Sequence, residues 1–350
     1  MSNTPNAHTG SFASDNWAGI CPEAWAALGE ANDQHAPSYG EDAWTGEAAR
    51  LLRELFETDC EVFFLFAGTA ANSLALASLC PPFASVLCHE VAHIATDECG
   101  APGFFAHGTT LLPLAGVHGK VTPASIDSAV KRRRDIHAPL PRALSLTQAT
   151  ELGTVYTPAE IAAVSTVARD HGLRVYMDGA RFANALATLQ VAPRRLSWEA
   201  GIDVLTFGGT KNGLALGEAL IFFDRDLARF FEYRRKQGGQ LASKMRFLSA
   251  QWTGVLRDGA WLRNAAHANA MAARLEQGLA SLQGTRILYP REANAVFAAM
   301  PEPVINGLHA RDWHFYTDVG PDGAARLMCS WDTTIEAVDA FLGDAADLSK

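Results

Sequence analysis

The sequence lacks long apolar runs and an excess of positive charge. No stretch approaches the roughly 18 consecutive apolar residues that a membrane-spanning helix needs. Lysine and arginine number 29 against 38 aspartates and glutamates, so the net charge is -9. This balance argues against nucleic acid or an anionic membrane as the main partner. With 48% apolar and 19% charged residues, the chain of 350 residues is predicted to be a soluble protein with a large core.

Cysteine patterns and nucleotide-binding fingerprints are lacking as well. The six cysteines include no CxxC pair and no spacing typical of a disulfide framework, so we expect reduced, mostly buried thiols. The opening MSNTPNAHTG has no charged start followed by an apolar stretch, which favours a cytoplasmic protein. No GxGxxG motif follows an early apolar segment, which argues against a nicotinamide-binding oxidoreductase.

Short apolar segments alternate with segments of helical period between about residues 46 and 245. The series runs from EVFFLFAG and TAANSLALASL to RVYMDGAR, DVLTFGGTK and EALIFFD. This rhythm predicts βαβ units, and therefore an α/β fold with a mainly parallel sheet whose strand carboxyl ends meet at one edge. Beyond Met245 the pattern predicts a smaller C-terminal α+β domain. We therefore expect an N-terminal segment 1–45, a large domain 46–245 and a small domain 246–350.

Three polar motifs follow predicted strands. Gly68 and Thr69 open a helix whose free N–H groups would hold a phosphate, although Thr69 could equally be an ordinary N-cap. Asp178 ends a strand, where a carboxylate needs a cation or a protonated ring nitrogen, unless it only shapes a turn. Lys211 lies among glycines in FGGTKNG, where it can lose its proton near neutral pH and form a Schiff base. The alternative for Lys211 is a turn lysine in solvent.

The combination of these motifs indicates a site for pyridoxal phosphate. A phosphate cradle, a carboxylate and a lysine on separate strand ends supply a partner for the phosphate, the pyridinium nitrogen and the aldehyde of this cofactor. Each motif has an ordinary structural explanation, but chance rarely supplies all three together. The sequence therefore predicts a pyridoxal-phosphate-dependent enzyme.

The sequence resembles the threonine aldolases, of the low-specificity L-threonine or L-phenylserine kind, within the aspartate-aminotransferase-like fold (fold type I). The resemblance covers nearly the whole chain and is carried by FASDNWAG, SYGEDAW, GTAANSLALASLC, HEVAHIATDECGAPG, MDGARFANAL, FGGTKNGLALGEA and RRKQGGQLASKMRFLSAQW. It implies pyridoxal-phosphate-dependent retro-aldol cleavage of L-threonine, L-allo-threonine or L-phenylserine to glycine and an aldehyde. A β-eliminating lyase or an aminotransferase is the alternative, because the same cofactor anchors serve many reactions.

The resemblance also implies roles for the cofactor-binding and catalytic residues. Lys211 would hold the cofactor covalently, and Asp178 would pair with its ring nitrogen. Gly68 and Thr69 would bind its phosphate. His93 would stack on the ring and could serve as the base that takes the β-hydroxyl proton.

The resemblance implies further residues for the substrate and for a neighbouring subunit. Arg181, Arg326 and Ser14 would hold the substrate carboxylate, and Arg181 would also contact the phenolate oxygen of the cofactor. The residues expected to reach the site of a neighbouring subunit are Tyr39, Lys236 and either Lys244 or Arg246. A homodimer or homotetramer with shared active sites is implied, and segment 1–45 would contribute to the active site.

One segment departs from the family pattern. Many threonine aldolases carry a second histidine after the strand that here reads ALSLTQATELG, where this chain has Gln148, Thr150 and Glu151. That histidine is associated with the β-hydroxyl group of the substrate. Its absence leaves open which residue acts as the base and which β-carbon stereochemistry is preferred.

The segment from His89 to His93 matches HExxH, the pattern of zinc proteases. In those enzymes two histidines one helical turn apart bind the metal and the glutamate activates water. The preceding SVLC reads as a strand, and no third ligand follows at a suitable spacing. We therefore expect no metal site.

Overall fold

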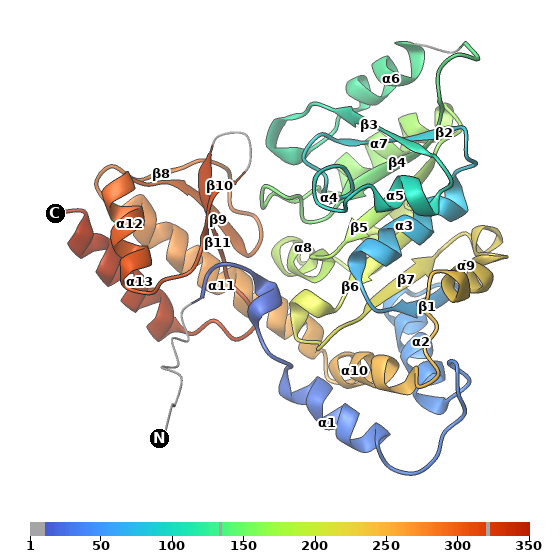
Figure 1. Cartoon of the computed structure of the whole chain (residues 1–350), viewed down its shortest axis with the longest axis horizontal. Helices are drawn as coiled ribbons and strands as arrows, with labels where there is room; N and C mark the ends of the chain where they lie inside the picture. Colours follow the sequence, from blue (N-terminus) through green and yellow to red (C-terminus); the bar gives the residue numbers. More distant parts are fainter. Residues whose placement is uncertain (1–10, 133–134, 320–322) are drawn as a thin grey trace.

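The computed structural model describes residues 11–132, 135–319 and 323–350. Within these residues the strands form a seven-stranded and a four-stranded sheet (Figure 1). The large sheet contains β1 (Glu61–Leu65), β2 (Ala84–His89), β3 (Thr110–Leu114), β4 (Leu140–Thr147), β5 (Arg174–Gly179), β6 (Val204–Gly208) and β7 (Glu218–Phe222). The small sheet contains β8 (Arg286–Ile287), β9 (Ala295–Ala299), β10 (Tyr316–Val319) and β11 (Ala324–Met328).

The large sheet has the strand order β1-β7-β6-β5-β4-β2-β3. Its pairs are parallel except those of β7, which runs antiparallel to β1 and to β6. Asp178 on β5 lies opposite Thr147 on β4 and Thr206 on β6, and Glu218 at the start of β7 lies opposite Leu65 at the end of β1. The predicted α/β fold with a mainly parallel sheet is confirmed, and the polar strand ends share one edge.

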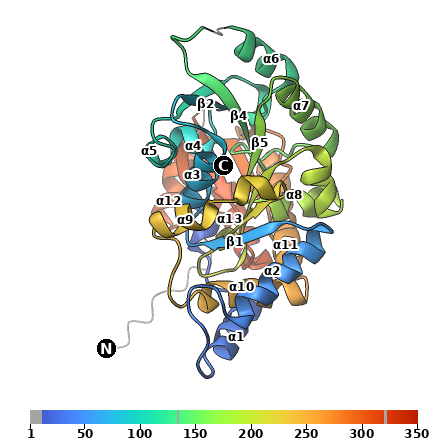
Figure 2. The same cartoon turned by 90° about the vertical axis from the view of Figure 1, so that its right-hand side faces the viewer.

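Helices cover both faces of the large sheet, which is why its strands are almost continuously apolar. One face packs against α2 (Ala43–Phe56), α7 (Pro158–Asp170), α8 (Phe182–Leu189) and α10 (Arg246–Arg257). The other packs against α3 (Gly68–Leu79) and α9 (Phe231–Gln237). Figures 1 and 2 show the sheet between these two layers. The remaining helices before the small sheet are α1 (Pro22–Ala31), α4 (His93–Thr96), α5 (Ala101–Phe105) and α6 (Pro123–Arg132).

The small sheet lies beside the large one and contacts it through two segments. One of its faces packs against α11 (Ala260–Ala280), α12 (Glu302–Ala310) and α13 (Ile335–Leu348), together with Phe12 from the N-terminal segment. Its other face packs against Leu152, from the turn after β4. The small sheet and the N-terminal segment therefore lie against the edge where the strands of the large sheet end.

Two further observations concern the described residues. None of their helices combines the length and the apolar character needed to cross a membrane. All six cysteines are free; five are buried and Cys99 is exposed. The expectation of reduced, mostly buried thiols agrees with this distribution.

Candidate active site

A cavity of about 340 Å³ lies at the carboxyl ends of the parallel strands. Turns after β1, β2, β4, β5 and β6 contribute to its walls. The predicted cofactor and catalytic residues that line it are Gly68, Thr69, His93, Asp178, Arg181 and Lys211. The sheet topology brings them together because parallel strands end at the same edge.

The start of α3 forms one end of this cavity. Ala67 is the N-cap of the helix and Gly68 is its first residue, so the alternative of an N-cap at Thr69 is wrong. The first helical hydrogen bond runs from the Ala71 N–H to the Ala67 carbonyl at 3.0 Å, which leaves the N–H groups of residues 68–70 without intrahelical acceptors. A Cβ atom built at Gly68 meets no neighbouring atom within 4 Å. The open space beside these donors suits a phosphate group.

Asp178 is buried at the end of β5 and is held by donors that carry no charge. Its Oδ2 accepts a hydrogen bond from Nδ2 of Asn72 at 2.9 Å, and its Oδ1 accepts one from the Ala180 N–H at 3.0 Å. The amide of Asn72 is itself fixed, because its oxygen accepts a hydrogen bond from the Tyr176 hydroxyl. In the described part of the chain no lysine or arginine forms an ion pair with Asp178. Its negative charge can therefore pair with a protonated ring nitrogen.

Lys211 lies in the cavity, in a short 3-10 turn (Thr210–Asn212) that follows β6. The turn is held from β7, because the Gly209 N–H donates to Oε2 of Glu218 at 2.9 Å. A Cβ atom at Gly209 would lie 2.5 Å from the Gly217 carbonyl oxygen, so this close approach requires glycine. The positive charge of Arg181 and burial lower the pKa of Lys211. A neutral amine, which can act as a nucleophile, is thereby favoured.

His93 begins α4 and contacts two carboxylates. Its Nδ1 lies 2.8 Å from Oε1 of Glu98, and this hydrogen bond raises the pKa of His93. Its backbone N–H donates to Oε1 of Glu151 at 2.7 Å. The same Glu98 oxygen accepts a hydrogen bond from Asn72 at 2.6 Å. A chain of hydrogen bonds thus runs from His93 through Glu98 and Asn72 to Asp178.

The HExxH segment does not form the helix that a zinc protease needs. His89 ends β2 and His93 begins α4, so the two imidazoles are not on one helix. Nε2 of His89 instead lies 3.0 Å from the Gly116 carbonyl oxygen. Among residues 11–132, 135–319 and 323–350, no three His, Cys, Asp or Glu side chains form a group that could hold a metal ion.

Arg181 is bound by an aspartate from the N-terminal segment. Its Nε and Nη2 donate to the two carboxylate oxygens of Asp15 at 2.7 and 2.8 Å. Asp15 also accepts a hydrogen bond from Asn294 at 3.1 Å. Burial alone would raise the pKa of Asp15, but the charges of Arg181 and Lys211 and the hydrogen bonds from Arg181 and Asn294 together outweigh burial, and the pKa is lowered. The ion pair ties the N-terminal segment to the large sheet at the cavity wall.

Arg326 and Ser14 lie next to this ion pair and are absent from the cavity wall itself. Nη2 of Arg326 donates to the Ala13 carbonyl at 3.3 Å, while its Nε is buried without a hydrogen-bond partner. The hydroxyl of Ser14 accepts a hydrogen bond from the Asn16 N–H at 3.2 Å. Asn16 does line the cavity. The two predicted substrate residues therefore flank the Arg181 end of the site.

Tyr39 and Lys236 lie together on the outer surface. Nζ of Lys236 is 4.6 Å from the centre of the Tyr39 ring, and the Tyr39 N–H donates to the Ser243 carbonyl at 3.0 Å. Both Tyr39 and Lys244 are exposed, and Arg246 is partly buried. None of these side chains lines the cavity.

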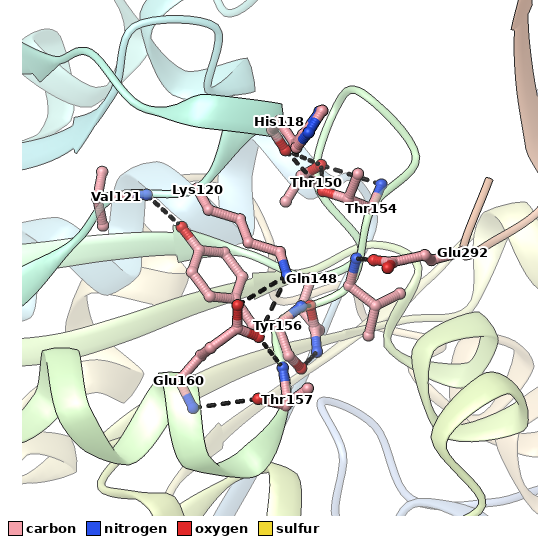
Figure 3. Close-up of polar contacts among 11 residues, drawn as sticks. His118, Lys120, Val121, Gln148, Thr150, Thr154, Tyr156, Thr157, Glu160 and Glu292 are labelled. Atoms are coloured by element: carbon pink, nitrogen blue, oxygen red, sulfur yellow. Dashed lines mark hydrogen bonds and ion pairs between the residues drawn. The ribbon is translucent and has the colours of Figure 1, made fainter. Parts of the chain in front are cut away.

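The turn after β4 is fixed by a network of polar contacts among residues that do not line the cavity (Figure 3). Gln148 binds both backbone groups of Tyr156, donating to its carbonyl at 2.8 Å and accepting from its N–H at 3.0 Å. The Thr154 hydroxyl donates to the His118 carbonyl at 2.6 Å, and the Val155 N–H donates to Glu292 at 2.7 Å. The position of Glu151 at the cavity wall is therefore set by the rigid turn around it.

Sequence reasoning missed several polar residues of the site. These are Asp15, Asn72, Glu98 and Glu218. A signal existed for Asn72, which is a polar residue in the otherwise apolar helix TAANSLALASL and lies one turn after Gly68. No comparable signal marks Glu218, which reads as part of an ordinary strand.

The fold and the site together define a class of protein. A lysine amine of lowered pKa, a buried carboxylate free of cations and an open helix start around one cavity match the groups that pyridoxal phosphate requires. With this sheet order, they define a pyridoxal-phosphate-dependent enzyme of fold type I.

Comparisons with known proteins identify the family. Residues 11–302 match the profile of the beta-eliminating lyase family. The chain is 59% identical over 337 residues to a low specificity L-threonine aldolase of Pseudomonas aeruginosa, covering 96% of this chain and 97% of that protein. The chain therefore belongs to the β-eliminating lyase family, among the threonine aldolases.

Similarity to solved structures extends over the whole fold. The structure of a Leishmania major threonine aldolase superposes with a TM-score of 0.91 at 31% identity, covering 97% of this chain and 99% of that one. Mouse CSAD superposes with a TM-score of 0.76 at 15% identity, covering 98% of this chain and 84% of that one. The second likeness shows the shared fold alone.

Proposed function

We propose that this chain cleaves L-threonine, L-allo-threonine or a related β-hydroxy-α-amino acid such as L-phenylserine to glycine and an aldehyde. The observation that carries the proposal is a single cavity that holds Lys211, Asp178 and Arg181. The relatives at 59% and 58% identity bear the name low specificity L-threonine aldolase, which supports the same reaction here.

The cofactor residues act through charge and position. When bound, pyridoxal phosphate supplies an electron sink for the bond that breaks at Cα. Lys211 offers an unprotonated amine, and Asp178, oriented by Asn72, keeps a proton on the ring nitrogen. Gly68 and Thr69, at the start of α3, hold the phosphate through backbone N–H groups.

The substrate residues decide which bond breaks. Arg181 and Arg326, with Ser14 beside them, would hold the substrate carboxylate, and Arg181 would also contact the phenolate oxygen of the cofactor. A fixed carboxylate fixes the orientation of the other groups on Cα, so the Cα–Cβ bond is the one presented for cleavage. His93, which lines the cavity, would cover the cofactor ring and is one candidate base for the β-hydroxyl group.

The division of the chain and its assembly are part of the same proposal. The chain divides into segment 1–45, which contributes to the active site, a large domain 46–245 and a small domain 246–350. The Asp15–Arg181 ion pair supports the role of the first segment. Tyr39 and Lys236, with Lys244 or Arg246, reach the site of a neighbouring subunit in a homodimer or homotetramer. Their exposure away from their own cavity supports this arrangement. The enzyme acts in the cytoplasm.

Product analysis of the purified holoenzyme tests the proposed reaction. L-threonine, L-allo-threonine and L-phenylserine are each supplied, and aldehyde and glycine are measured in equal amounts if the proposal holds. L-serine serves to detect β-elimination through pyruvate, and a 2-oxo acid acceptor serves to detect transamination. Pyruvate or transamination products without aldehyde from any of the three substrates would overturn the proposal.

A further inference from the structure

Glu151 presents one unused carboxylate oxygen in the cavity. Its Oε1 accepts hydrogen bonds from the His93 N–H at 2.7 Å and from the Thr147 hydroxyl at 3.0 Å. Its Oε2 is buried and has no hydrogen-bond partner. Glu151 lines the same cavity as Lys211. Since a buried polar atom without a partner is costly, this oxygen points to a group that binds beside it.

Two sets of contacts hold Oε2 of Glu151 in place. The two donors on Oε1 fix the carboxyl group, and the network of Figure 3 fixes the turn that carries it. Within the described residues, no lysine or arginine forms an ion pair with Glu151. The free oxygen can therefore accept a proton from a substrate group without breaking an existing contact.

The surroundings of Glu151 suit proton exchange near neutral pH. Burial raises the pKa of Glu151 to about 7, against the lowering effect of its hydrogen bonds. The charged and titratable groups that act on it are Asp178, whose charge acts in the same direction as burial, the Arg181 guanidinium, and the buried thiol and phenol of Cys88 and Tyr156. His93 contacts it through its backbone N–H. The carboxyl can thus both take up and release a proton.

His93 is less suited to the same task. Its Nδ1 is committed to Glu98, and that hydrogen bond raises the pKa of His93. A raised pKa keeps the imidazole protonated to higher pH, and a protonated imidazole cannot accept a proton. Nε2 of His93 lies 3.7 Å from Oδ2 of Asp97, which also favours the charged form.

We propose that Glu151 is the catalytic residue that accepts the β-hydroxyl proton of the substrate through Oε2. This inference rests on the proposed retro-aldol function and deepens it. The O–H proton moves to Oε2, the O–H electron pair becomes the second bond of the aldehyde carbonyl, and the Cα–Cβ bond breaks with its electron pair left at Cα. A proton from solvent is then added at Cα to form glycine, and Glu151 releases the proton it accepted back to solvent, so the cycle has no net proton change.

The variant Glu151→Gln separates this role from a structural one. It keeps an acceptor for the His93 N–H and removes the base, so kcat for aldehyde release is expected to fall about 100-fold or more. The exchange of the α-protons of glycine in D2O, followed by NMR, needs no β-hydroxyl base and should stay within about threefold of the wild type. Cofactor affinity, measured by absorbance titration of the apoenzyme, should also be retained.

The pH profile adds a second readout. In the wild type, kcat/KM for L-threonine should rise as the pH passes through about 7 and Glu151 loses its proton. This limb should vanish in E151Q and persist, at a lower rate, in E151D. The control is Glu302→Gln, which alters an exposed carboxylate on α12, outside the cavity wall and outside the network of Figure 3, and should leave both reactions unchanged.

The outcomes distinguish failure of the role proposed for Glu151 from failure of the proposed retro-aldol function. E151Q cleavage within about fivefold of the wild type, or a parallel fall of cleavage and glycine exchange, would overturn the role of Glu151. If E151Q does not fold, the pH dependence of kcat/KM in E151D is the test. Loss of the rise near pH 7 in E151D would also overturn the role of Glu151 as the base. A wild type that releases no aldehyde would instead contradict the proposed function itself.

Discussion

At the scale of single residues, three functional side chains of the site are each held by a neighbour that takes no part in the proposed reaction. Asp178 is held by Asn72, Arg181 by Asp15, and His93 by Glu98. The neighbours fix the orientation of the reactive groups and set their charge. Substitutions of the reactive residues should therefore lower activity more than substitutions of the neighbours that hold them.

Lys211→Ala should abolish aldehyde release and the visible absorbance of the lysine-linked cofactor, because no other amine replaces Nζ in the cavity. Activity assays and absorbance spectra of the purified protein measure both effects. Lys131→Ala, which removes an exposed lysine paired with Asp127, is the control and should change neither. Turnover retained in K211A would assign the covalent role to another residue.

Asp178→Asn should lower kcat by about 10²–10³-fold, because the neutral amide no longer holds a proton on the ring nitrogen. Asn72→Ala leaves Asp178 in place but removes the amide that orients it and that also binds Glu98, and should cost about tenfold. Steady-state kinetics of both variants with L-threonine give the comparison. A near-wild-type rate for D178N would exclude Asp178 as the partner of the ring nitrogen.

At the scale of secondary structure elements, the strand ends contribute the chemical groups of the site, and the connections between strands decide how these groups are oriented. The connection between β6 and β7 runs from Gly208 to Glu218, too short for a crossover helix, so β7 returns antiparallel. This return places Glu218 against the turn of Lys211. The start of α3 adds the backbone N–H groups proposed to bind the phosphate.

Gly68→Val should weaken cofactor binding by about tenfold or more, because the added side chain enters the open space at the start of α3. Titration of the apoenzyme with pyridoxal phosphate measures the affinity. The melting temperature of the apoenzyme should change little, since no protein atom lies within 4 Å of the new Cβ.

Gly46→Ala is the matched control for this prediction. Gly46 also has no atom within 4 Å of a built Cβ, but it lies in α2, outside the cavity wall. Its substitution should leave cofactor affinity unchanged and stabilise the helix by about 1 kcal/mol. Equal cofactor affinities of G68V and the wild type would contradict the proposal that the phosphate binds at the start of α3.

At the scale of the whole molecule, the site is built from parts distant in sequence. The N-terminal segment, the large sheet and β11 of the small sheet meet around Arg181, Asp15 and Arg326. Tyr39 and Lys236 remain outside this assembly on the surface. The proposed sharing of sites between subunits gives these two residues a function.

Mixing of inactive variants tests the shared site. Lys236→Ala and Lys211→Ala subunits, denatured and refolded together, should recover activity up to about a quarter of the wild type, because hybrid dimers contain one complete site. Each variant refolded alone is the control and should stay far less active than the mixture. Light scattering should give a multiple of the 37.6 kDa chain. No recovery in a mixture shown to contain hybrids would place Lys236 outside the partner's site.

The fold and the centre of the site could be predicted from the sequence because their signals are local. Apolar segments in a βαβ rhythm predict the parallel sheet, and polar residues directly after those segments predict its functional edge. Gly68 and Lys211 follow β1 and β6, Asp178 lies at the end of β5, and the structure gathers all three in one cavity. The resemblance to the threonine aldolases added the remaining roles.

Only the tertiary structure decided which partners these residues have. Asp15 and Arg181 are 166 positions apart, and Asn72 and Asp178 are 106 apart, so their pairing follows from packing and leaves no local pattern. The unpartnered oxygen of Glu151 is likewise visible only when every neighbour is in place. Sequence periodicity indicates which face of an element is buried. The charge state of a buried group, and whether each of its polar atoms has a hydrogen-bond partner, depend on what surrounds the group in three dimensions.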